Sequence, residues 1–149
     1  MIAKKQPYKI IPYPHRRNIG KIIPSPCHKK KEGEEIAAKI LSSMGSDVKF
    51  LPELHIPNIK NPDCEWRGII WEIKTLYGNS RDTTIEAIHK GAKQSHNIII
   101  NACLTKRDIN RVAIDICFYF KTDPASYQAK QILVLGKNEY SLIKRNMLK

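Results

Sequence analysis

Apolar residues recur along the first half of the chain at two spacings, and these spacings predict a helix followed by strands. Residues 32–45, EGEEIAAKILSSMG, place apolar positions on one helical face and close on a glycine, which suits a helix end. Residues 47–51 alternate as a strand that stops before Pro52. Residues 64–66 and 69–75 then flank Arg67-Gly68, so we expect a β-hairpin whose second arm, rich in β-branched and aromatic residues, is a central strand.

The second half of the chain continues with helix, strand, helix and two strands. Asp82 or Thr83 can cap a helix that runs to about Ser95, and the apolar run HNIIINACL predicts a strand buried on both faces. Residues 105–120 fit both periods, but Thr105 and Asp108 resemble a capping box and favour a helix. Residues 130–136 predict a strand, and residues 139–145 an edge strand that closes a hairpin with it.

Length and composition limit the class of protein. A chain of 149 residues with 42% hydrophobic content can bury one core, so we expect one domain with an appendage. No apolar run is long enough to span a bilayer, and the first residues lack the apolar segment of a signal peptide, so we expect a soluble, cytoplasmic protein without a membrane partner. The four cysteines have no metal-finger spacing, so we expect reduced thiols.

Charge indicates the partner. The chain has 26 Lys and Arg against 14 Asp and Glu, a net charge of +12, which suits a protein that binds nucleic acid. Residues 1–31 hold nine of these cations, no acid and five prolines, so we expect an extended basic arm before a domain of residues 32–149. The arm could grip phosphates or be a flexible linker. Its candidate nucleic-acid contacts are Arg16, Arg17, Lys29, Lys30 and Lys31.

Three charged residues in and beside the predicted hairpin suggest a metal site. Glu72 and Lys74 are two residues apart on a strand, so their side chains share a face, and Asp63 can reach that face from the start of the facing strand. Two adjacent carboxylates repel each other unless a cation lies between them, and such oxygen ligands suit Mg²⁺ or Mn²⁺. The alternative is a cross-strand ion pair on the surface.

The predicted helix of residues 32–45 offers one further acid. Glu34 lies three residues before Ala37 and seven before Leu41, so it borders the buried face, whereas Glu35 points further around the helix. If an acid of this helix belongs to the site, we expect it to be Glu34. The alternative is that both acids only complement the dipole of the first helical turn.

The residues Pro62-Asp63, eight intervening positions and Glu72-Ile73-Lys74 resemble the motif of the PD-(D/E)XK nuclease superfamily. This resemblance implies a restriction-endonuclease-like α/β core, a central mixed sheet flanked by helices in the order αβββαβ. From about residue 32 to 145 the chain is also similar to the C-terminal tRNase toxin domain of contact-dependent growth inhibition proteins, found in phage and mobile-element proteins too. The most specific likeness lies between WEIKT and KQSHNIII.

The resemblance also implies roles for individual residues. Glu34, Asp63, Glu72 and Lys74 would form the metal and catalytic set, with Gln94 beside it. A second Asp common in the family before the hairpin glycine is replaced here by Arg67, a phosphate-seeking cation. Further candidate contacts to nucleic acid are Arg81, Lys90 and Lys93, although lysines at a helix end can also be solvated.

Two functions from different classes therefore remain. The first is a Mg²⁺- or Mn²⁺-dependent endonuclease. The toxin-domain resemblance favours RNA, especially tRNA, as its substrate and implies an immunity protein as a possible partner. The alternative substrate is DNA, as for an endonuclease of a phage or mobile element. The second is a non-catalytic nucleic-acid-binding protein that keeps the fold. The two differ in whether Asp63, Glu72 and Lys74 converge on one cation.

Overall fold

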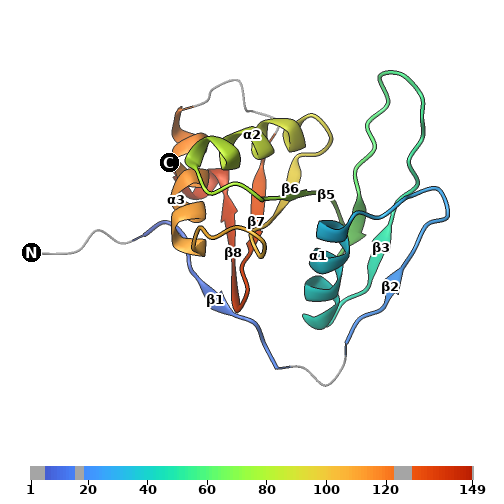
Figure 1. Cartoon of the computed structure of the whole chain (residues 1–149), viewed down its shortest axis with the longest axis horizontal. Coiled ribbons are helices and arrows are strands. Elements are labelled where there is room, and N and C mark those ends of the chain that lie inside the picture. The colour runs from blue at the N-terminus through green and yellow to red at the C-terminus, as the bar shows by residue number, and fades with distance from the viewer. Residues whose placement is uncertain (1–5, 16–18, 123–128, 149) are drawn as a thin grey trace, which may run out of the picture.

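A mixed eight-stranded sheet organises the protein (Figure 1). The computed structural model describes residues 6–15, 19–122 and 129–148. The strand order across the sheet is β1-β8-β7-β6-β5-β4-β3-β2. The strands are β1 (Ile11–Pro12), β2 (Ile22–Ile23), β3 (Val48–Phe50), β4 (Cys64–Trp66), β5 (Ile69–Thr75), β6 (Asn97–Asn101), β7 (Gln131–Leu135) and β8 (Glu139–Lys144). The helices are α1 (Glu32–Ser43), α2 (Arg81–Ala92), α3 (Ile109–Thr122) and a short 3-10 helix (Arg145–Leu148).

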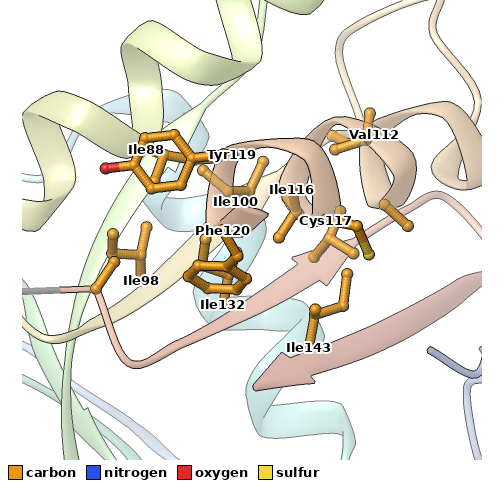
Figure 2. Close-up of a cluster of buried hydrophobic side chains, with 14 of the residues drawn as sticks. Ile88, Ile98, Ile100, Val112, Ile116, Cys117, Tyr119, Phe120, Ile132 and Ile143 are labelled. Carbon is orange, nitrogen blue, oxygen red and sulfur yellow. The ribbon is translucent and has the colours of Figure 1, made fainter. Parts of the chain in front are cut away.

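The predicted αβββαβ order is confirmed as α1-β3-β4-β5-α2-β6, and α3, β7 and β8 follow it. Helix α1 packs on β3, β5 and β6, whereas α2 and α3 pack on the other face, against β5–β8 (Figure 1). The predicted strand of residues 96–104 is β6, where Ile98 and Ile100 point into one core and Ile99 into the other. Alternating side chains of a central strand must be apolar on both faces in such a three-layer arrangement. Figure 2 shows the core beneath α2 and α3.

Strand β5 changes partner halfway along its length. Its first half, Ile69–Trp71, pairs antiparallel with β4, and its second half, Glu72–Thr75, pairs parallel with β6. The predicted hairpin is confirmed, with Arg67 and Gly68 in its turn at φ values of 53° and 74°. Positive φ at both turn residues matches the twist of the flanking strands. One side of β5 therefore loses its strand neighbour at Glu72.

Two short strands from the described part of the basic N-terminal segment form the two edges of the sheet. Strand β1 pairs antiparallel with β8, and β2 pairs parallel with β3. Tyr8 and His28 are buried. The expected edge position of β8 is therefore wrong, because β1 covers it. Residues 6–15 and 19–31 thus add one short strand to each edge of the sheet. The separate basic arm and its boundary at residue 31 stay predictions, and Arg16 and Arg17 lie outside the described residues.

The predicted helix starts of α2 and α3 need correction. Ser80, not Asp82 or Thr83, caps α2, because its Oγ accepts the Thr83 N–H at 3.3 Å. At α3 the Asp108 carboxylate accepts the Arg111 N–H at 3.0 Å, which is an ordinary N-cap contact. The Thr105 hydroxyl instead donates to the Gly78 carbonyl at 2.7 Å and ties the loop before α3 to the loop after β5.

Two findings bear on the environment of the protein. All four cysteines are free, as expected for reduced thiols. Within the described ranges no helix has the length and apolar content that crossing a membrane requires.

Candidate functional site

The start of β4 places Asp63 beside Glu72. The hairpin register pairs Cys64 with Trp71, and the Asp63 N–H donates to the Trp71 carbonyl at 3.0 Å. Its carboxylate Oδ2 accepts the Ile73 N–H at 2.8 Å. The Asp63 side chain thus replaces a backbone hydrogen bond to β5 at the position just before β4 begins. This contact fixes the carboxylate at the position where β5 changes partner.

Glu72 is a buried carboxylate, and only one of its two oxygens has a polar partner among the described residues. Its side chain is 7% exposed, and its Oε2 atom lies 3.4 Å from Nζ of Lys74. Its Oε1 atom is buried without a hydrogen-bond partner among the described residues. Burial, together with the neighbouring Asp63, raises the pKa of Glu72 to about 9, although Lys74 lowers it. Burial and the neighbouring carboxylate therefore favour the neutral, protonated form of Glu72.

The first turn of α1 brings Glu34 to the same place. Glu34 is buried, whereas Glu35 is exposed. Burial and the nearby Asp63 raise the pKa of Glu34, and its contact with His28 opposes that rise. The structure thus places Glu34, the helix acid expected from the sequence, within 4.8 Å of Asp63.

Close packing against the ends of β5 and β6 positions the start of α1. The Gly33 carbonyl accepts from the buried amide Nδ2 of Asn101 at 2.9 Å. A Cβ atom at Gly33 would overlap the Thr75 side chain, so only glycine allows this approach. The helix start is therefore held against the sheet, and Glu34 projects toward Asp63.

His28 completes the cluster, and sequence reasoning missed it. Its Nδ1 donates to the Leu51 carbonyl at 2.8 Å, and its Nε2 lies 2.8 Å from Glu34 Oε2 and 3.7 Å from Asp63 Oδ1. Burial lowers the pKa of His28, but its hydrogen bonds to Glu34 and Leu51 and the adjacent carboxylates outweigh this, so the pKa is raised. His28, Glu34 and Asp63 offer atoms close enough to hold one metal ion.

A cleft of about 610 Å³ surrounds these groups. Lysines and an exposed tyrosine stand among the acids that line it, so an anion entering the cleft meets positive charge first. Glu53, which sequence reasoning also missed, lies 3.7 Å from His28 Nε2. The charged and aromatic lining residues are Lys29, Lys30, Lys31, Glu34, Glu53, Asp63, Glu72, Lys74 and Tyr77.

Gln94 lies outside the lining of this cleft, but it supports the strand that carries Asp63. Its Oε1 accepts the Asn61 N–H at 2.8 Å, two residues before Asp63. The Asn61 side chain in turn bonds to both backbone groups of Leu54 and closes the loop between β3 and β4 at its base. Gln94 therefore fixes the entry to β4.

The other candidate nucleic-acid contacts lie away from the cleft. Arg67 stacks over Trp66 at 4.2 Å and donates to the Met44 carbonyl, at the far end of α1. Arg81 pairs with the buried Asp115, and Lys90 pairs with Glu86 at 2.9 Å. Lys93 is exposed after the end of α2. Of the predicted contacts that the structure describes, Lys29, Lys30 and Lys31 are thus the ones that line the cleft with the acids.

Comparison with known proteins identifies the family. The model of the contact-dependent growth inhibition CdiA C-terminal domain matches residues 60–140, more than half of the chain. Among the curated proteins none matches. A chain of the CdiA-CT/CdiI toxin and immunity complex from Burkholderia pseudomallei has a similar fold, with a TM-score of 0.55 and 21% identity over 84% of this chain and 99% of that one. The chain described here therefore belongs to the CdiA C-terminal domain family of contact-dependent growth inhibition.

Proposed function

We propose that the protein is a metal-dependent endonuclease of PD-(D/E)XK type that hydrolyses phosphodiester bonds as a toxin. The observation that carries the proposal is the convergence of three buried carboxylates, Glu34, Asp63 and Glu72, beside the Lys74 ammonium. A structural ion pair would not need three acids to share one cleft, because each additional buried carboxylate raises the cost of ionising the others.

The residues present fit a divalent cation. Two observations support this fit. Oε1 of Glu72 is buried without a hydrogen-bond partner among the described residues, and burial together with the nearby Asp63 raises the pKa of both Glu72 and Glu34, which a bound cation would counteract. Of the cluster of His28, Glu34 and Asp63, the two carboxylates together with Glu72 in the same cleft would hold Mg²⁺ or Mn²⁺ through hard oxygen ligands, while His28 Nε2 stays bonded to Glu34. When bound, such an ion would supply charge stabilisation to a phosphoryl group.

The remaining polar groups of the cleft have tasks that follow from their positions. Lys74 Nζ is partly exposed and can donate to a phosphoryl oxygen or orient a water, because its ammonium lies at the mouth of the carboxylate cluster. His28 orients Glu34 through Nε2 while Leu51 fixes its other nitrogen. Lys29, Lys30 and Lys31 can grip phosphates, and exposed Tyr77 offers a ring on which a base can stack.

The proposed substrate is RNA, and tRNA in particular, met in the cytoplasm of a target cell. This choice is supported by the family and by the likeness to a toxin with its immunity protein, which also favours an immunity protein as partner of this chain. The net charge of +12 suits either RNA or DNA. A DNA endonuclease with the same site is therefore the alternative to be separated by experiment.

A cleavage assay tests the proposal. Purified protein is incubated with labelled tRNA and with plasmid DNA in Mg²⁺, Mn²⁺ or EDTA. We expect metal-dependent cleavage of tRNA, lost by about a hundredfold or more in Glu72→Gln and Lys74→Met, as when a preorganised transition-state contact is removed. Glu86→Gln and Lys39→Met, matched changes at exposed positions, should retain activity. Cleavage unaffected by EDTA, or retained by Glu72→Gln, would contradict the proposal.

A further inference from the structure

A second cavity, of about 690 Å³, lies away from the carboxylates. It is bounded by the end of α3, the start of β7, the end of β8 and the short 3-10 helix, and we call it the basic groove. Three lysines and an arginine line it, and no lining residue in the described part of the chain is acidic. These cations are Lys121, Lys130, Lys144 and Arg145.

The floor of the basic groove is fixed by specific contacts. The Arg145 guanidinium donates to the Ala129 carbonyl at 2.9 Å and lies over the Phe120 ring at 4.6 Å. The Arg145 N–H donates to the Lys130 carbonyl at 3.0 Å, which holds the two basic segments together. The groove is therefore preformed, and little ordering of its backbone is needed before a ligand binds.

The three lysines are available for an anion. Lys121, Lys130 and Lys144 are exposed, and none forms an ion pair with a described acid. Other cations are engaged differently: Arg81 and Arg107 both pair with the buried Asp115. Gathering uncompensated like charges around one concave surface costs repulsion, which an anionic ligand would relieve.

A chain of hydrogen bonds connects the basic groove to β5, the strand that carries Glu72 and Lys74. The Lys130 N–H donates to the His96 carbonyl at 2.7 Å, and the Gln131 amide donates to Asn97 Oδ1 at 2.9 Å. Asn97 Nδ2 in turn donates to the Ile70 carbonyl, two residues before Glu72. Strands β5 and β7 are two positions apart in the sheet, which is about 10 Å.

From this placement we propose that the basic groove binds the sugar–phosphate backbone of the nucleic-acid substrate at a distance from the bond that is cut. The proposal rests on the proposed nuclease function and adds a second contact to it. A polyanionic strand can place one phosphate at the carboxylate cleft and others over Lys121, Lys130 and Lys144, because each exposed ammonium can neutralise one phosphate. An acidic protein would be the other class of ligand for such charges.

Binding in EDTA tests the groove separately from catalysis. The triple variant Lys121→Gln, Lys130→Gln, Lys144→Gln is compared with a control triple variant at exposed lysines elsewhere, Lys39→Gln, Lys49→Gln, Lys137→Gln, which has the same net charge. Fluorescence anisotropy with a labelled RNA hairpin is recorded over a range of salt concentrations. We expect the groove variant to bind at least about tenfold more weakly than the control variant, with a slope of log affinity against log salt reduced by about 2, as for three lost phosphate contacts.

The outcomes separate the groove from the active site. Equal affinities and slopes for the two triple variants would overturn the groove proposal, even if the wild-type protein cleaves RNA. If the wild-type protein cleaves no nucleic acid with any metal but the groove variant alone loses affinity, the groove stands and the nuclease function fails. In the cleavage assay the groove variant should raise KM with kcat nearly unchanged, because the groove touches no reacting atom.

Discussion

Replacing Glu72 by Gln should stabilise the metal-free protein at neutral pH. The ordinary pKa of the side chain is 4.5, and in the fold it is raised to about 9. A raised pKa contributes stability that is complete below the ordinary value and is lost as pH rises toward the folded value. Between about pH 5 and pH 9, folding of the wild-type protein therefore requires Glu72 either to take up a proton or to remain as a buried charge, and both cost free energy. A glutamine at this position is neutral at every pH and has neither cost.

The structure sets the size of this effect. Between about pH 4.5 and about pH 7.5 the wild-type protein can lose at most about 4 kcal/mol of its free energy of unfolding through Glu72, since each pH unit is worth about 1.4 kcal/mol. Losing the partly exposed contact to Lys74 costs less than about 1 kcal/mol. We therefore expect Glu72→Gln to raise the free energy of unfolding by about 1–3 kcal/mol at about pH 7.5, and to have little effect near pH 4.5.

Urea unfolding in EDTA, followed by the fluorescence of the buried Trp66 and Trp71, measures the difference at both pH values. Glu86→Gln is the matched control, because Glu86 is exposed and its pKa is lowered by Lys90, so no gain with rising pH is expected there. A Glu72→Gln variant that is less stable than wild type at both pH values, by the same amount, would refute the reasoning. It would show that the carboxylates do not repel each other in the apo fold.

Three further predictions concern other parts of the site. Lys74→Met should change the melting temperature by only a few degrees and should retain Mn²⁺ binding, measured by calorimetry. Cleavage should fall by about a hundredfold or more, because the ammonium acts on the substrate and not on the fold. Loss of Mn²⁺ binding would contradict this. Gly33→Ala should lower the free energy of unfolding by about 1–3 kcal/mol and weaken Mn²⁺ binding, since the new Cβ overlaps Thr75 and displaces the helix start that carries Glu34; Gly68→Ala, which meets no neighbour at its Cβ, separates strain at a positive φ from displacement of α1. Deleting residues 1–31 should lower stability and Mn²⁺ affinity together, because both edge strands and His28 leave with the segment; an unchanged melting temperature would show that the segment adds nothing to the fold.

Local patterns predicted the elements nearest the site. The hairpin follows from Arg67-Gly68 between two alternating runs, and both the period of two on β5 and the apolar run of β6 survive in the fold. Glu34 could be preferred to Glu35 because helical geometry alone separates their faces. These inferences need only residues that are close in sequence.

Long-range pairing could not be predicted in the same way. Strands β1 and β2 have two residues each, too few for a periodic pattern, and Ile11 pairs with Tyr140 across most of the chain. His28 gives no local signal in a basic, proline-rich segment. It joins the acids through its contacts with Glu34 and with the carbonyl of Leu51, which is distant in sequence. At the start of α2 several polar residues could cap, and only the fold selects Ser80.

The most direct test of the central claim is a crystal structure of the protein with Mn²⁺, using anomalous scattering to locate the ion. We predict one peak in the cleft lined by Glu34, Asp63 and Glu72, with at least two of their carboxylate oxygens within about 2.6 Å of it, and with Lys74 Nζ outside the coordination sphere. The same crystals of Glu72→Gln should show a weaker peak or none. A fully occupied site elsewhere, or no peak in this cleft at saturating Mn²⁺, would contradict the claim that these carboxylates form a metal centre.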